Sequence, residues 1–405
     1  MSRNKIYLKN YIGTKHLRNK NYKKLDSKFQ KIFKSINDEV KNKHKTLNVL
    51  SKKYKFSFKK SQLNKFKKYN KIALIGMGGS ILGAEAIYYF FKEKIKKKFY
   101  FFNDLNEKKL LNLKKNENLN KILFIIISKS GNTIETLSNI FSLNILRAKA
   151  NNVIIISENK NNLLCNLARK LNLFFVEHNK HIGGRYSVLS EVGLIPALFM
   201  GISLPKIRKK LSSFLGGKNK KKLKENSIKL ASIMNSKKFN NLILLNYSPE
   251  LEKFLFWCQQ LIAESLGKKN KGFLPIISNA PKDHHSLLQL YLDGPKDKFF
   301  CIFSLDEETK TYINAPKIPK KKIFLHQKSI GKIKMSQKKA LIKTFIKNDI
   351  PFREFKINKK DEEIIGELFA YFILETIIIG KLSNVNPYDQ PAVEQVKVLT
   401  KKILS

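Results

Sequence analysis

Acidic residues are scarce in this chain of 405 residues. The 80 lysines and arginines face only 31 aspartates and glutamates, which leaves a formal charge of +49. So positive a protein attracts anions, and its candidate partners are nucleic acid, acidic membrane and phosphorylated metabolites. The lysines are spread over the whole chain rather than gathered into one arm. This scatter favours a coding bias over a dedicated polyanion site, so we expect no nucleic-acid partner.

Cysteines and long apolar runs are also few. The three cysteines lie far apart, at Cys165, Cys258 and Cys301. Because the chain has no CxxC pair and no disulfide framework, a reducing compartment is expected. The stretch before the first acidic residue has no apolar signal core. Both features favour the cytoplasm. The most apolar late stretch (364–380) carries Glu367 and Glu375. Two carboxylates there predict a buried helix rather than a membrane span.

Short apolar runs recur between residues 71 and 176. They are KIALIG (71–76), FYFF (99–102), KILFIII (121–127), NVIII (152–156) and LFFV (173–176). Helix-like stretches, such as 81–95 and 133–150, separate them. Strands buried on both faces that alternate with helices predict a parallel sheet covered by helices on both sides.

A second series of strands and helices begins after a lysine-rich stretch. Its expected strands are NLILLN (241–246), FFCIFS (299–304), KKIFLH (321–326) and FREFKI (352–357), and its expected helices are 251–267, 361–379 and 391–404. The fold class is therefore α/β, with two tandem three-layer α/β/α sandwiches whose sheets are mostly parallel. We expect a basic, helical N-terminal segment (1–68), a first domain (69–205), and a second domain that ends in a C-terminal helix (206–405).

The first loop that could bind a ligand is GMGGSILGAE (76–85). A dinucleotide fingerprint would need glycine where Ile81 stands, and a P-loop would need lysine where Ala84 stands. What remains is a glycine-rich turn that offers backbone N–H groups and a hydroxyl at a helix N-terminus, from Gly78, Gly79 and Ser80. This arrangement favours an anion, although the glycines could equally serve close packing of strand and helix.

The second loop is SKSGNTIET (128–136), directly after the most apolar strand. Its polar groups include the hydroxyls of Ser128, Ser130 and Thr133 and the ammonium of Lys129. One hydroxyl could cap the following helix, but the loop has more hydroxyls than a cap needs. Two such loops on adjacent strands predict a bound phosphate group.

Two further stretches offer an arginine and a glutamate for chemistry. In HIGGRYSVLSEVGL (181–194), Gly184 lets the backbone approach a ligand, and Arg185 then enters a buried helix. A guanidinium there suits a developing oxyanion, or it pairs with a carboxylate such as Glu191. Glu264 in AESLGKK follows apolar residues, so it is either a base activated by desolvation or a salt-bridged surface group.

The stretch PKDHHSLLQL (281–290) holds two adjacent histidines, His284 and His285. They could be metal ligands, a proton-transfer group with its neighbour, or solvated loop residues. No third ligand stands at a suitable spacing, so no metal is expected. The residues alone do not choose between the two histidines.

Taken together, these stretches resemble the phosphoglucose isomerase family, whose members are built from two sugar-isomerase (SIS) domains. The motifs that carry the resemblance run in family order: GMGGSILG (76–83), SKSGNTIET (128–136), GGRYSVLSEVGL (183–194), ESLGK (264–268), DHHSLLQL (283–290) and QPAVEQVK (390–397). The resemblance implies an aldose–ketose isomerase that interconverts glucose 6-phosphate and fructose 6-phosphate through a cis-enediol, without metal or cofactor.

The resemblance also implies a role for individual residues. The positions that match its sugar-phosphate site are Ser80, Ser128, Lys129, Ser130 and Thr133. Arg185 matches the arginine that steadies the enediolate, and Glu264 matches the base that carries a proton between C2 and C1. His285, identified by the serine and the Gln-Leu pair that follow it, matches the ring-opening histidine, assisted by Lys397. The family pattern further implies a homodimer with a shared site, into which His285 reaches from the partner.

Two positions depart from the family pattern. Leu266 stands where the family commonly has asparagine, and Ala392 replaces a usual glycine. Three rival functions follow from the same residues: a dual phosphoglucose/phosphomannose isomerase, a non-catalytic SIS sensor of sugar phosphates, and a polyanion-binding protein. The presence of Glu264, Arg185 and His285 together disfavours the sensor, because a sensor needs only the phosphate loops.

Overall fold

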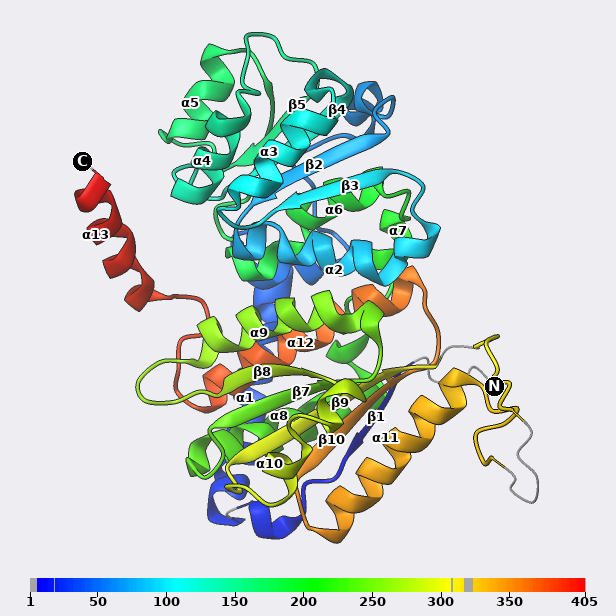
Figure 1. Ribbon diagram of the computed structural model, residues 1–405. Coiled ribbons are helices and arrows are strands. Elements are labelled where there is room, and N and C mark those ends of the chain that lie inside the picture. The colour runs from blue at the N-terminus through cyan, green and yellow to red at the C-terminus, as the bar shows by residue number, and fades with distance from the viewer. Residues whose placement is uncertain (1–5, 18, 307–308, 317–322, 405) are drawn as a thin grey trace.

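Two five-stranded sheets lie one above the other in the computed structural model (Figure 1). The structure describes residues 6–17, 19–306, 309–316 and 323–404. The strands of the first sheet, in spatial order, are β3 (Lys98–Phe102), β2 (Lys71–Gly76), β4 (Ile122–Ile127), β5 (Val153–Ser157) and β6 (Phe174–Glu177). All neighbours in this sheet are parallel. The predicted α/β fold with mostly parallel sheets is thus confirmed.

The first sheet is buried on both faces, as its sequence predicts. Every residue of β4 is buried, and alternate residues of β2 contribute to opposite hydrophobic clusters. Helices cover both sides: α3 (Glu107–Asn116), α4 (Ile134–Leu143) and α5 (Leu163–Lys170) on the outer face, α2 (Leu82–Phe91) and α6 (Glu191–Phe199) on the inner face. A short helix, α7 (Leu204–Arg208), follows α6.

The strand order creates a crevice between β2 and β4. From β2 the chain moves outward to β3 on one side, and β4 then pairs with the other side of β2. In open parallel sheets, ligands bind beyond the carboxyl ends of strands where the order reverses. The two loops predicted to bind an anion begin at this point, because Gly76 and Ile127 are register partners at the ends of β2 and β4.

At each edge of the second sheet lies a strand that the sequence did not predict. Its order is β1 (Ile6–Asn10), β10 (Phe352–Ile357), β9 (Lys298–Leu305), β7 (Asn241–Asn246) and β8 (Leu274–Asn279), with β1 antiparallel and the others parallel. The prediction that residues 1–68 are helical is therefore wrong for Ile6–Asn10. Helix α1 (Asn19–Lys41) follows β1 and packs against α8 (Gly217–Ser236) and α12 (Glu362–Leu382).

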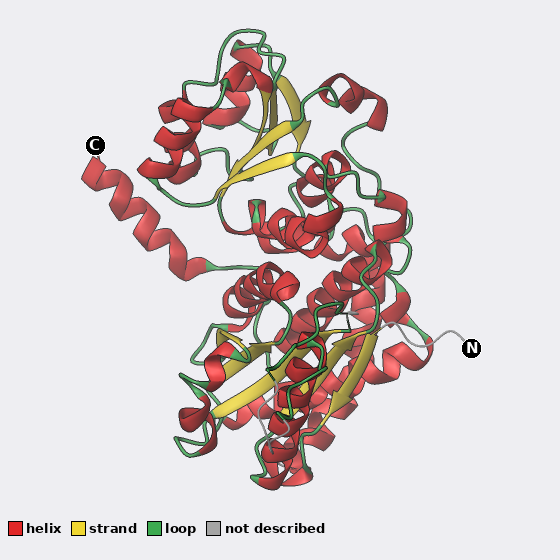
Figure 2. Cartoon of the chain, turned by 45° about the vertical axis from the view of Figure 1, so that its right-hand side comes forward, coloured by secondary structure: helices red, strands yellow, loops and turns green. Residues whose placement is uncertain are grey.

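The two sheets share one hydrophobic core. Residues of α1, α8, α9 (Glu252–Leu266) and α12 join those of α2 and α6 in a single buried cluster between the sheets. The opposite face of the second sheet is covered by α10 (Leu288–Leu292) and α11 (Ile330–Lys347). Figure 2 shows the strands of each sheet enclosed by helices in this way. Because α2 packs directly on α9, loops from both sheets meet at the boundary.

Two predicted elements differ in the structure. Residues 321–322 of the expected strand KKIFLH lie outside the described residues, Ile323 has no regular structure, and residues 324–327 form a turn. Phe324 there is 81% exposed, so the apolar residues of this run face no sheet. The predicted C-terminal helix is present as α13 (Glu394–Leu404), but it stands away from the body of the protein (Figures 1 and 2).

Candidate active site

Three hydroxyl groups gather at the N-terminus of α4. Thr133 Oγ1 lies 2.9 Å from Ser128 Oγ and 3.4 Å from Ser130 Oγ. Thr133 is the N-cap residue of α4, but its side chain makes no capping hydrogen bond. The capping alternative therefore does not account for this hydroxyl. Hydroxyls and backbone N–H groups at a helix N-terminus form a site for an anion.

Glycine is required at the tip of this loop. Gly131 has φ +71°, and a Cβ there would lie 1.8 Å from Asn162 Oδ1. The Gly131 N–H is 3.2 Å from Ser128 Oγ. Backbone and hydroxyls are thus held in one compact turn, which Asn162 supports from the start of α5.

The ammonium of Lys129 points away from the three hydroxyls. Its Nζ donates to the carbonyl oxygen of Lys180 at 2.9 Å and lies 3.4 Å from Glu158 Oε1. Burial lowers the pKa of Lys129, and Glu158 opposes this effect. Lys129 therefore ties the 128–133 loop to the segment before Arg185.

The glycine-rich turn after β2 packs backbone against backbone. Gly78–Ser80 form a short 3-10 helix whose Gly79 lies against the loop that carries Arg185. A Cβ on Gly79 would lie 2.2 Å from the carbonyl carbon of Gly184. A Cβ on Gly184 would meet nothing within 4 Å. The close approach of the two backbones therefore requires glycine at position 79 and not at position 184. Ser80, at the end of the turn, is half-buried.

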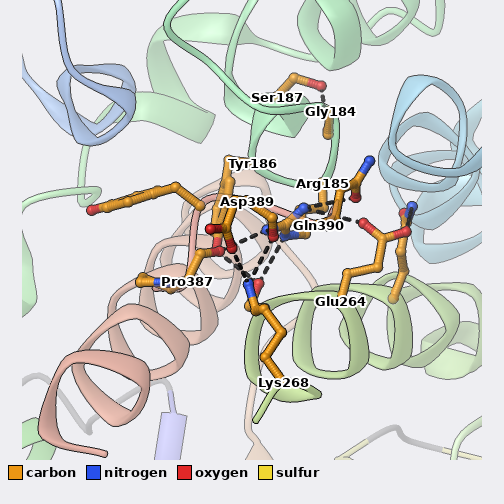
Figure 3. Close-up of polar contacts among 12 residues, drawn as sticks. Gly184, Arg185, Tyr186, Ser187, Glu264, Lys268, Pro387, Asp389 and Gln390 are labelled. Carbon is orange, nitrogen blue, oxygen red and sulfur yellow. Dashed lines mark hydrogen bonds and ion pairs between the residues drawn. The ribbon is translucent and has the colours of Figure 1, made fainter. Parts of the chain in front are cut away.

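Arg185 is buried, and the protein satisfies all five of its N–H donors (Figure 3). Its Nε donates to Ser265 Oγ at 2.8 Å. Nη1 donates to Glu264 Oε2 at 3.3 Å and to Gln390 Oε1 at 3.0 Å, and Nη2 donates to two carbonyl oxygens, those of Pro387 and Asp389. Since a guanidinium has five N–H groups, none is left over. The partner is Glu264 and not the alternative Glu191, which accepts from Tyr54 and the Asn179 N–H.

Glu264 lies in the last turn of α9, and each of its two carboxylate oxygens accepts a hydrogen bond. Oε1 accepts from Gln260 Nε2 at 2.9 Å, and Oε2 accepts from Arg185. Its side chain keeps 29% of its surface exposed, against 3% for Arg185. The carboxylate is thus oriented by two donors and still open to solvent on one face. This arrangement suits a general base.

Several residues of this site escaped prediction from the sequence. They are Gln260, Ser265, Lys268, Gln390 and the buried Tyr186, whose hydroxyl contacts Ser265 and Pro387. For Gln260 a signal existed, because a residue four positions before Glu264 shares its helix face. The others stand within the motifs that carry the family resemblance, but their contacts could not be predicted, because they meet across loops distant in the sequence.

The structure does not bring His285 to Glu264 within one chain. The turn that holds the two histidines follows β8, whose last residue Asn279 donates to Glu252 at the start of α9. Glu264 lies twelve residues further along α9, about 18 Å at 1.5 Å per residue. His284 is hydrogen-bonded to Tyr247 through Nε2 at 2.8 Å, whereas His285 is exposed. Burial, and next the neighbouring His285, lowers the pKa of His284.

Lys397 is also remote from Glu264 in this chain. It lies on α13, 60% exposed, and pairs with Glu394 at 2.6 Å. The motif that contains Lys397, QPAVEQVK (390–397), nevertheless begins in the site, because the side-chain oxygen of Gln390 accepts a hydrogen bond from Arg185. The turn 386–390 therefore joins α13 to the Arg185–Glu264 pair.

Metal ligation finds no support among the described residues. Within the ranges that the structure describes, no group of three or more His, Cys, Asp or Glu side chains could hold a metal ion. In the same ranges, no helix has the length and apolar character needed to cross a membrane.

Comparison with known proteins gives four consistent matches. The family model of phosphoglucose isomerase matches residues 14–273. A glucose-6-phosphate isomerase of Methanocaldococcus jannaschii is 33% identical over 84% of this chain and 87% of its own length. One of Campylobacter jejuni is 31% identical over 91% of this chain and 94% of its own. The solved structure of a glucose-6-phosphate isomerase of Chlamydia trachomatis superposes on this chain with a TM-score of 0.69, and the match covers 91% of this chain and 74% of that one. At 18% sequence identity this match shows the shared fold alone.

Proposed function

This chain belongs to the phosphoglucose isomerase family, and from that premise we propose how its residues perform the reaction. It is an aldose–ketose isomerase that interconverts glucose 6-phosphate and fructose 6-phosphate. The observation that carries the residue assignment is the pairing of Glu264 with Arg185, whose backbone packs against the glycine-rich turn after β2.

In the proposed reaction the phosphate group binds at the N-terminus of α4. The hydroxyls of Ser80, Ser128, Ser130 and Thr133 donate hydrogen bonds to its oxygens, and Lys129 adds positive charge. Glu264 removes the proton from C2 of the open-chain aldose and returns it to C1, while a second proton leaves the oxygen on C2 and one is added to the oxygen on C1. One C–H and one O–H bond break and one of each forms, so the composition of the sugar is unchanged. Arg185 stabilises the enediolate oxygen by exchanging one of its present partners, Glu264 or Gln390, for it.

Ring opening requires a second acid/base group, and we assign it to His285 with Lys397. In its own chain His285 follows the strand that contacts the opposite end of α9, and Lys397 pairs with Glu394 on α13. A homodimer in which His285 of one protomer enters the active site of its partner would bring His285 close to Glu264. The exposed apolar side chains of α13 support a protein partner, since Val396, Leu399 and Ile403 are 67%, 58% and 82% exposed.

The working compartment proposed for this enzyme is the cytoplasm, and no nucleic acid takes part. The three cysteines are free and buried, in keeping with a reducing compartment.

The decisive experiment is a coupled assay of the purified protein with fructose 6-phosphate and with mannose 6-phosphate. We expect turnover of fructose 6-phosphate and none of mannose 6-phosphate. Failure to turn over fructose 6-phosphate would reject the proposed function. Turnover of both sugars would instead support the dual phosphoglucose/phosphomannose isomerase.

The adjacent histidines provide a matched pair of variants. We expect His285→Ala to lower kcat from the cyclic sugar about 100-fold, the typical contribution of a positioned acid/base group. His284→Ala removes only the bond to Tyr247, and we expect its activity to stay within about threefold of wild type. Equal losses in the two variants, measured in the same assay, would contradict the assignment of His285.

A further inference from the structure

Lys268 joins the end of the helix that carries Glu264 to the turn that carries Gln390 (Figure 3). All three N–H groups of its ammonium are used. They donate to the carbonyl oxygens of Asn386 and Asp389, the latter at 2.7 Å, and to Asp389 Oδ1 at 2.8 Å. The other carboxylate oxygen of Asp389 accepts from the side chain of Asn386 at 2.8 Å.

The same turn is held by Arg185 from the other side. Arg185 donates to the carbonyl oxygens of Pro387 and Asp389 and to the side chain of Gln390. The carbonyl oxygen of Asp389 thus accepts from both cations. Since Lys268 follows the last residue of α9 by two positions, movement of the turn is coupled directly to the end of that helix.

A simple surface ion pair would not have these properties. Exposed pairs contribute little, because water screens them and the long side chains lose entropy. Here the Lys268 side chain is only 14% exposed, and two of its three bonds go to backbone oxygens. Removal of the ammonium would leave three acceptors of one turn without this donor.

We propose that Lys268 is a positioning residue, which fixes the 386–390 turn so that Gln390 stays against Arg185 and α13 leaves the site in a defined direction. Its link to catalysis rests on the proposed function, because it acts through Arg185 and Gln390. Lys268 itself touches none of the hydroxyls that gather at the anion loop.

Kinetics of Lys268→Met with fructose 6-phosphate test this role. We expect kcat/KM to fall about 10- to 100-fold, as for misplacement of a positioned group by about 1 Å. The matched control is Lys271→Met, because Lys271 donates only to Ser383, at the end of α12 and outside the turn; we expect it to stay within about twofold of wild type. Similar losses in both variants, or none in Lys268→Met, would overturn the proposal.

A double variant distinguishes positioning from a general loss of stability. If Lys268 acts through Gln390, the kcat/KM of the double variant Lys268→Met/Gln390→Ala should lie within about twofold of that of the slower single variant. The losses do not add, because both changes act on the same contact. Losses that multiply would overturn the route through Gln390.

Amide hydrogen exchange separates this proposal from the proposed function. We expect amides of residues 386–392 to exchange at least about 10-fold faster in Lys268→Met than in wild type or Lys271→Met. Unchanged exchange would overturn the proposal even if the enzyme is active. Faster exchange in a protein that does not turn over fructose 6-phosphate would retain the role in the turn and reject the proposed function alone.

Discussion

Replacement of Glu264 by glutamine is expected to lower kcat for fructose 6-phosphate about 1,000-fold and to leave the fold intact. A positioned general base contributes between about 100- and 10,000-fold, and an amide cannot accept the C–H proton. The new side chain fits the site, because Gln260 Oε1 is buried without a hydrogen-bond partner and can turn to accept from the new amide. Arg185 keeps an oxygen acceptor at the same place.

Steady-state assays and thermal unfolding of Glu264→Gln are the measurements. A suitable control is Glu225→Gln on α8, which removes an exposed carboxylate paired with Lys229. We expect this control to keep wild-type activity. Near-normal turnover by Glu264→Gln would show that another group moves the proton.

The second large effect is expected from Gly79→Ala. The added Cβ would lie 2.2 Å from the carbonyl carbon of Gly184 and 2.5 Å from the backbone nitrogen of Arg185. These are backbone atoms, so no side-chain rotation relieves the overlap, and the Gly78–Ser80 turn and the Arg185 loop must separate. We expect kcat/KM to fall about 100-fold, and the free energy of unfolding to fall by about 1–3 kcal/mol, as in other overpacked cores.

Gly13→Ala is the matched control for this variant. A Cβ on Gly13 would meet its nearest atoms at 4.0 Å, an ordinary contact. The same assay and melting experiment should find it close to wild type. An active, stable Gly79→Ala protein would mean that the two loops have room to separate without moving Arg185.

Much of the fold follows from local composition. The strands of the first sheet are predicted because runs such as KILFIII are too apolar to lie anywhere but between two layers of helices. Strand β8 escapes prediction because Pro275 within LPIISN argues against a central strand. The structure explains its place, since β8 forms an edge of its sheet, where a missing N–H is tolerated.

Strand β1 escapes prediction for a different reason. Its five residues alternate between exposed and half-buried, a pattern too short and too polar to stand out. Its partner is β10, with Ile6 opposite Ile357, so the pairing depends on a strand some 350 residues later. No reading of the first 68 residues alone contains that information.

The sequence by itself determined the layered α/β fold, and it supplied the two loops and the individual side chains that are the candidates for anion binding and chemistry. It could do so because apolar runs, glycines and hydroxyls act through neighbours in the chain. Only the tertiary structure decided which of these groups meet. It pairs Arg185 with Glu264 rather than Glu191, places His285 at the opposite end of α9, and brings Lys268 and Gln390 to the site. Arg185 reaches Glu264 across 79 residues and Gln390 across 205, and contacts of that separation arise only when the two sheets pack on a common core.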